Sequence, residues 1–146
     1  MHTSSTRARS SALSVPTPET AALVAHCRPD VVVHLAARPG VRASLEDPVT
    51  SADINVRGLA LMLQAARAAG VPHFVFASSS SVYGERSHGP FKETDRVDHP
   101  VSPYAATKKA GELLCHSFAH AFGTSIAALR FFTVYGPRQR PEMAIA

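Results

Sequence analysis

The amino-acid sequence predicts an α/β fold that forms part of a doubly wound parallel sheet. Three short apolar runs alternate with longer segments that carry helical periodicity and capping residues. Runs that are apolar throughout are typical of strands buried on both faces, and strands separated by helices pair in parallel through right-handed crossovers. Ligands bind beyond the carboxyl ends of such strands, so residues 35–42, 78–84 and 131–140 are the segments to examine for a site.

The first helix and strand are expected between residues 17 and 37. Thr17 can cap a helix that has Pro18 at its first position, and Pro29 ends that helix. The run VVVHLAA, residues 31–37, follows as the first strand. The sixteen residues before this unit are rich in Ser and Arg and contain no acidic residue, so we expect a disordered lead over 1–16. A transit peptide is the alternative, but an amphipathic apolar face is missing.

The second helix is predicted from about Pro48 to Ala69. Gly70 supplies its C-terminal cap and Pro72 blocks its extension. The apolar run HFVFAS, residues 73–78, then forms the second strand.

The third helix has the clearest boundaries in the sequence. Ser102 is its cap, Pro103 occupies its first turn, and it runs to about Phe122 before Gly123 stops it. The run SIAALRF, residues 125–131, is the third strand. Residues 17–146 therefore read as one α/β domain.

Composition excludes several classes of function. Apolar runs are far shorter than the roughly 20 residues of a membrane span, and the net charge of +4 comes mostly from twelve scattered arginines, which argues against nucleic acid. Cys27 and Cys115 are far apart and have no CxxC partner, so we expect no disulfide framework and a cytoplasmic protein. His116 and His120 lie four apart, but no HExxH motif or carboxylate completes a metal site, and none is predicted.

Small and hydroxyl-bearing residues follow the first two strands. Ala36 and Ala37 come at the end of the first strand, where small side chains let a flat ring or a sugar approach the backbone; packing beneath a helix is the alternative. Four serines, residues 78–81, follow the second strand. Their hydroxyls need partners, which either a ligand or the local backbone of a turn can provide.

Tyr104 and Lys108 open the third helix four residues apart. This spacing places both side chains on one helix face, whereas Lys109 is turned roughly 100° away. A tyrosine acting as a base at pH 7 needs its pKa lowered by about three units, or roughly 4 kcal/mol. One cation about 4 Å away in a partly shielded site supplies about that much.

The combination of these motifs resembles the NAD-dependent sugar epimerase/dehydratase group of the extended short-chain dehydrogenase/reductase family. The serine-rich strand end ASSSSVYG, the helix start SPYAATKKAGELL and the strand end LRFFTVYGPRQRPEMA carry the resemblance. They read most like the same stretches of UDP-glucuronate 4-epimerases. The resemblance implies a Rossmann-like fold that binds NAD and a nucleotide sugar.

Residue by residue, the resemblance implies a catalytic trio. Tyr104 matches the tyrosine that removes the proton of the sugar 4-hydroxyl, and Lys108 matches the lysine that holds the nicotinamide ribose and lowers the tyrosine pKa. Ser79 matches the hydroxyl that hydrogen-bonds the reacting oxygen. Besides Tyr104 and Lys108, the matched cofactor positions are Leu35, Ala36, Ala37 and Phe132; the substrate-side positions are Ser79, Ser80 and Thr133.

Two further features favour C4 epimerisation of a UDP-sugar, UDP-glucuronate first among them. Related dehydratases carry an Asp-Glu pair where this chain has Ser80 and Ser81, and serines cannot do that acid/base work at neutral pH. Arg42, Arg138 and Arg140 are candidates for a cationic clamp on a uronate or a diphosphate, with solvated loop arginines as the alternative. Another nucleotide-sugar epimerase or a decarboxylase is the alternative assignment.

The family also has parts that this sequence is expected to lack. The first glycine is Gly40, so the glycine-rich turn that cradles the cofactor pyrophosphate is not found, and the C-terminal substrate domain is not found either. We expect the central piece of an epimerase, with a non-catalytic remnant that binds or dimerises as the alternative. Apolar residues on several faces of the helices at about 48–69 and 103–122 indicate burial beyond the sheet, and the resemblance implies a homodimer that pairs through these helices.

Overall fold

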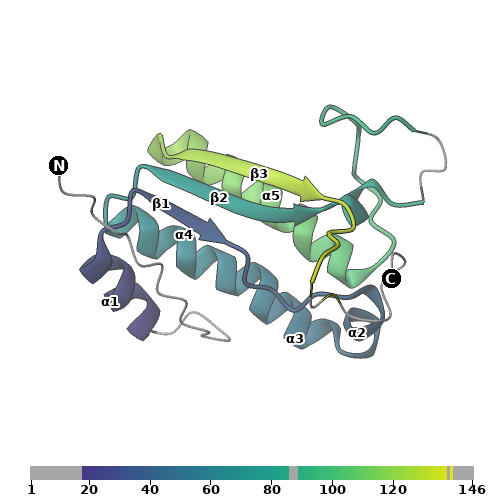
Figure 1. Cartoon of the computed structure of the whole chain (residues 1–146), viewed down its shortest axis with the longest axis horizontal. Helices are drawn as coiled ribbons and strands as arrows, with labels where there is room; N and C mark the ends of the chain where they lie inside the picture. Colours follow the sequence, from purple (N-terminus) through teal and green to yellow (C-terminus); the bar gives the residue numbers. More distant parts are fainter. Residues whose placement is uncertain (1–17, 86–88, 138, 140–146) are drawn as a thin grey trace.

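A three-stranded parallel sheet forms the centre of the computed structural model, which describes residues 18–85, 89–137 and 139. The strands are β1 (Val31–His34), β2 (His73–Ser79) and β3 (Ser125–Phe131), in the order β1-β2-β3 (Figure 1). The amino ends of the strands are in register, because Val31 pairs with His73 and His73 pairs with Ser125. The predicted α/β class, the parallel pairing and the order of elements are confirmed.

The predicted helices are present, with one addition and one interruption. The short helix α2 was not expected, and the second predicted helix contains a single π-helical turn, η1. The bounds are α1 (Pro18–Cys27), α2 (Val41–Glu46), α3 (Pro48–Ala52), η1 (Asp53–Arg57), α4 (Gly58–Ala68), the 3-10 turn η2 (Ser80–Tyr83) and α5 (Pro103–Phe122).

Helix α5 begins and ends where its capping residues predict. The Ser102 hydroxyl accepts a 3.1 Å hydrogen bond from the amide of Ala105, and Pro103 occupies the first helical position. At the other end Gly123 adopts the left-handed conformation, φ 68°, that closes a helix. These caps fix the first turn of α5, which carries Tyr104.

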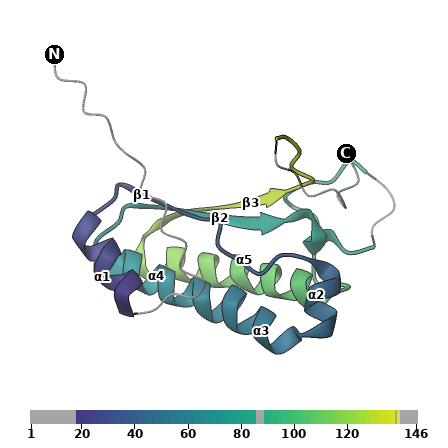
Figure 2. The same ribbon diagram turned by 60° about the horizontal axis from the view of Figure 1, so that its bottom comes forward.

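The described helices cover one face of the sheet. Figure 2 shows α1, α4 and α5 together beneath the three strands. The core lies between these two layers and is built on fully buried side chains of β2 and α4, namely Phe74, Phe76, Leu59 and Leu63. In the described ranges, no helix combines the length and the apolar character needed to cross a membrane.

The expectation that the strands are buried on both faces is wrong for this structure. Along β1 the side chains alternate between buried and exposed, and Val33 is 57% exposed while Val32 is buried. On β3, Leu129 and Phe131 are also exposed. The reason is geometric: successive strand residues point to opposite faces, and the described helices pack on only one of them.

Candidate active site

A cleft of about 440 Å³ opens at the carboxyl ends of the strands. Such ends are where open parallel sheets bind ligands, and the volume is within the range of small-molecule sites. Its lining comes from the ends of β2 and β3, the loops that follow β1 and β3, and the first turns of α5: Leu35, Ala37, Pro39, Ala77, Ser78, Ser79, Tyr104, Lys108, Phe131, Phe132 and Val134.

Tyr104 and Lys108 reach this cleft from the same face of α5. The Lys108 Nζ atom lies 5.8 Å from the centre of the Tyr104 ring. The backbone of Tyr104 is held on both sides, because its amide donates to Ser44 Oγ at 3.0 Å and its carbonyl accepts from Thr107 Oγ1 at 2.7 Å. The sequence spacing therefore produces the expected pairing of the two side chains.

The Lys108 ammonium group is buried beside the end of β2. Nζ donates a 2.7 Å hydrogen bond to the main-chain oxygen of Ala77, and the side chain is 4% exposed. Burial penalises the charged form and lowers the pKa of Lys108 to about 8. Lys108 consequently remains mostly protonated at pH 7 and carries a positive charge at the base of the cleft.

The serine-rich end of β2 combines the two interpretations that the sequence left open. Ser79 lines the cleft, yet its hydroxyl also caps η2: it accepts from the amide of Ser81 and donates to Ser81 Oγ, both at 3.2 Å. Ser78 lines the cleft too and donates to Glu112 Oε1 at 2.7 Å. Ser79 thus bonds within a turn and lines the cleft at the same time, whereas Ser78 lines the cleft and bonds to α5.

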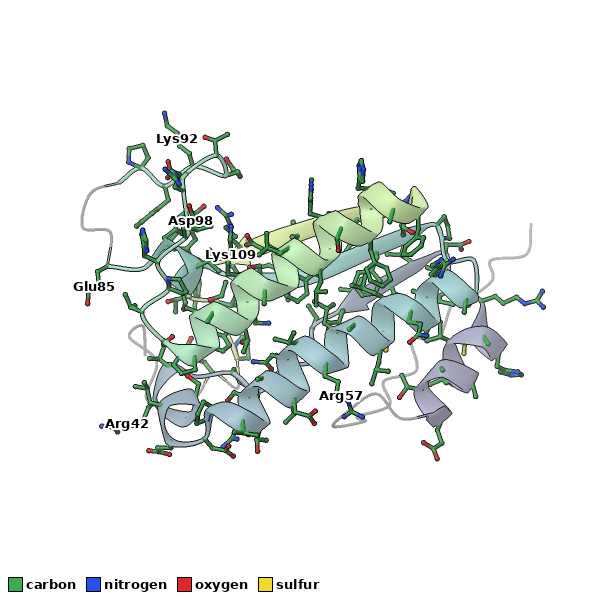
Figure 3. The ribbon with its side chains drawn as sticks, turned by 180° about the vertical axis from the view of Figure 1, so that it is seen from behind. Arg42, Arg57, Glu85, Lys92, Asp98 and Lys109 are labelled. Atoms are coloured by element: carbon green, nitrogen blue, oxygen red, sulfur yellow. The ribbon has the colours of Figure 1, made fainter. Side chains whose placement is uncertain are left out.

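The remaining predicted site residues divide into two groups. Leu35, Ala37 and Phe132 line the cleft, whereas Ala36, Ser80 and Thr133 are not among its lining residues. Arg42, on α2, is exposed, points away from the rest of the molecule in Figure 3 and is not among the lining residues, so its role as a clamp on a ligand stays a prediction. Arg138 and Arg140 lie outside the described residues.

A buried amide network beside the cleft was not predicted. Asn55, on the π-helical turn η1, accepts a 2.7 Å hydrogen bond from the amide of Arg38 and donates to the Arg38 carbonyl at 3.2 Å. Its Nδ2 also donates to Thr107 Oγ1 at 3.0 Å, which ties the loop after β1 to α5. The available signal was a polar residue inside an apolar helical pattern, because such a residue needs buried partners.

The comparisons with known proteins agree with this geometry. Residues 10–146 match the model of the NAD dependent epimerase/dehydratase family. The chain belongs to this family. It is similar to UDP-glucuronate 4-epimerase 1 of Arabidopsis thaliana, with 54% identity over 114 residues, which is 77% of this chain and 27% of that protein. It is 50% identical over 117 residues to the probable UDP-glucuronate 4-epimerase of Rhizobium meliloti, 80% of this chain and 34% of the relative.

A solved structure extends the likeness to three dimensions. UDP-glucuronic acid 4-epimerase from Bacillus cereus, in complex with UDP-glucuronic acid and NAD, superposes with a TM-score of 0.75 and 42% identity. The match covers 85% of this chain and 38% of that one. The chain therefore spans about a third of the length of the proteins it resembles.

Proposed function

We propose that the chain carries the reacting centre of an NAD-dependent nucleotide-sugar epimerase that acts on UDP-glucuronate. The observation that carries the proposal is the meeting of Tyr104, Lys108 and Ser79 in one cleft, from two different elements, at the carboxyl edge of a parallel sheet. These residue types supply an acid/base group, a cation and a hydroxyl donor. The names of the similar epimerases support the reaction and the substrate.

The cleft has the chemistry that the nicotinamide end of NAD requires. An ammonium group has three donors. Lys108 donates one hydrogen bond to Ala77, so two donors remain for the hydroxyls of a ribose. Leu35 and Phe132 provide apolar walls against which a nicotinamide ring can pack. These residues therefore fit the nicotinamide riboside part of the cofactor.

The proposed reaction exchanges one proton and one hydride at C4 of the sugar. NAD⁺, when bound, would supply the acceptor of that hydride and return it later. Tyr104 takes the proton of the 4-hydroxyl beside the Lys108 ammonium group, and Ser79 donates a hydrogen bond to the reacting oxygen. The 4-keto sugar turns over in the cleft, so that a hydride returned from the bound cofactor would reach the other face of C4, and Tyr104 returns the proton to the 4-oxygen.

Epimerisation is favoured over water loss by the residues that follow Ser79. Ser80 and Ser81 have no acidic or basic group at neutral pH, so the second acid/base pair that dehydration needs is not present at these positions. The uronate preference is tested by comparing kcat/KM for UDP-glucuronate with that for neutral UDP-sugars. Equal values for the two classes contradict it and favour another nucleotide-sugar epimerase.

Homodimerisation through α4 and α5 is part of the proposal. Leu113 on α5 is 58% exposed, and Leu61 and Met62 on α4 are half-buried. These apolar side chains lie on helices whose other faces pack in the core, so a second copy could cover them. Sedimentation equilibrium tests this, and a monomer at micromolar concentration contradicts it.

Isothermal titration of the chain with NAD⁺ tests the central proposal. We expect a dissociation constant in the micromolar range, about 1–100 μM. A Lys108→Met variant is the control and should show much weaker binding. No saturable heat with the parent chain at millimolar NAD⁺ contradicts the proposal and favours a non-catalytic module of the same fold.

A further inference from the structure

The guanidinium of Arg130, on β3, makes three hydrogen bonds and one aromatic contact among the described residues. Nε and Nη2 donate to the two carboxylate oxygens of Glu112 on α5, at 2.8 and 2.9 Å. Nη1 donates to the Glu93 carbonyl at 3.3 Å, and the guanidinium carbon lies 4.9 Å from the centre of the Tyr83 ring. Arg130 thus joins four segments of the chain: β3, α5, η2 and the loop that contains Glu93.

The Arg130–Glu112 pair differs from an ordinary surface ion pair. The side chains of Arg130 and Glu112 are only 16% and 13% exposed. Burial alone would raise the pKa of Glu112, but hydrogen bonds from Arg130 and Ser78 outweigh it and hold the pKa below its ordinary value. Glu112 is therefore a carboxylate at neutral pH, and its two-pronged contact fixes the position of Arg130.

Glu112 connects this pair to the cleft. Its Oε1 atom accepts a 2.7 Å hydrogen bond from Ser78 Oγ as well as the bond from Arg130. Ser78 lines the cleft and is the neighbour of Ser79 in β2. The carboxylate therefore holds the serine-bearing end of β2 against α5.

Arg130 connects the pair to an aromatic wall of the cleft. The rings of Tyr83, Phe91 and Phe132 form a cluster with centres 4.8, 5.6 and 6.2 Å apart, and Phe132 lines the cleft. The Tyr83 hydroxyl also donates to the Lys92 carbonyl at 3.2 Å. Phe91 and Lys92 belong to the loop segment 89–98, which lies beyond the strand ends and carries the labelled Lys92 and Asp98 in Figure 3.

We propose that Arg130 and Glu112 form a positioning pair, which fixes Ser78 at the cleft and fastens segment 89–98, through the Glu93 carbonyl and the Phe91 ring, against Tyr83 and Phe132. Arg130 is not among the residues that line the cleft, so it acts through these neighbours. The pair thereby sets how tightly the cleft holds a flat or cyclic ligand such as the nicotinamide riboside. This last step rests on the proposed function, whereas the fastening of segment 89–98 does not.

A single-tryptophan reporter tests the fastening without any ligand. The chain contains no tryptophan, and Phe91 is partly exposed at 37%, so Phe91→Trp places one fluorophore in the aromatic cluster. In this background Arg130→Met should shift the emission to longer wavelength and raise acrylamide quenching about twofold or more, because segment 89–98 loses its anchor. The control is Arg57→Met, which breaks the exposed Arg57–Asp53 pair and should leave emission unchanged.

Affinity for NAD⁺ is the second measurement. Arg130→Met and Glu112→Gln should each weaken the affinity for NAD⁺ about tenfold. Arg130→Lys should have a smaller effect, because a lysine keeps the charge but cannot make the two-pronged contact with Glu112. If Arg130→Met does not fold, Glu112→Gln, which keeps the side-chain shape, gives the emission measurement. Unchanged emission and quenching in a folded variant overturns the proposal, even when the melting temperature falls. If the parent chain does not bind NAD⁺, the proposed function fails. The emission result still decides whether Arg130 anchors segment 89–98.

Discussion

The ammonium group of Lys108 on α5 donates a 2.7 Å hydrogen bond to the main-chain oxygen of Ala77 near the end of β2. This contact holds a buried cation where the central strand meets the cleft, within 5.8 Å of the centre of the Tyr104 ring. A fold gains little from such a group, since burial disfavours its charged form. Its position fits its proposed role of holding a ligand that needs the charge.

Lys108→Met should separate stability from binding. The pKa of Lys108 is about 8 in the folded chain, below its ordinary 10.5, so the unfolded chain binds more protons above pH 8 and stability rises there with pH. We expect a gain of about 1 kcal/mol between pH 8 and 9 in the parent and no such gain in the variant. Burial raises the pKa of the Cys115 thiol to about 12, so above pH 9 the unfolded chain loses a thiol proton that the folded chain keeps. This effect opposes the increase in stability with pH. Urea unfolding at pH 7, 8 and 9 measures this. An identical pH slope in both proteins contradicts it.

Tyr104→Phe should remove chemistry and keep the cofactor. Loss of the phenol hydroxyl removes the proposed acid/base group but leaves Lys108 in place. We expect turnover of UDP-glucuronate to fall about 10²- to 10⁴-fold, with the affinity for NAD⁺ changed less than about threefold. The exposed Tyr135 provides the control, since Tyr135→Phe should leave both values unchanged. Retained epimerisation in Tyr104→Phe means that another group is the base.

Asn55→Ala should destabilise the chain. The substitution leaves the amide and carbonyl of Arg38 and the Thr107 hydroxyl without the partners they have now. Buried unpaired groups cost free energy, so we expect a loss of about 2–3 kcal/mol in the free energy of unfolding, measured in urea with the m-value unchanged. Gln64→Ala, at an exposed position of α4, should change it by less than about 0.5 kcal/mol. A similar small effect of Asn55→Ala disproves the structural importance of this bridge.

His34 should make the fold sensitive to mild acid. Its Nε2 atom is buried and has no hydrogen-bond partner among the described residues, and burial, with a smaller effect of the Lys108 charge, lowers its pKa to about 4. Between pH 6.5 and 4 His34 is therefore protonated in the unfolded chain and neutral in the folded chain, so stability falls as the pH falls. From pH 6.5 to 5 we expect a loss of about 1–2 kcal/mol, before carboxylates such as Asp47 begin to contribute. His34→Leu should flatten this slope, and the exposed His116→Gln should preserve it.

Gly111→Ala should destabilise α5 although alanine is the better helix former. A Cβ at this position would lie 2.5 Å from Phe76 Cζ and 3.0 Å from Leu59 Cδ2. Both neighbours are fully buried and cannot give way freely, so overpacking should cost about 1–3 kcal/mol and exceed the helix-propensity gain of about 1 kcal/mol. Thermal unfolding measures the difference. A higher melting temperature contradicts the close contact of α5 with β2.

Local sequence patterns are enough to predict the α/β class, the order of elements and the boundaries of α5. These follow from local chemistry: the Ser102 cap, Pro103 at the first turn and Gly123 at the end act within a few residues. The four-residue spacing of Tyr104 and Lys108 likewise fixed their common face, because a helix has a constant pitch. Parallel pairing also predicts where the cleft lies, because it brings the carboxyl ends of the strands to one edge of the sheet.

Only the tertiary structure decided which distant groups touch and which surface is covered. Asn55 meets Thr107 across 52 positions, and Arg130 meets Glu112 across 18, and no local pattern encodes either contact. The same is true of the open face of β1, whose valines are typical of a strand buried on both sides. Caps and periodicity depend on neighbours in sequence, whereas burial and long-range hydrogen bonds depend on how whole elements pack against each other.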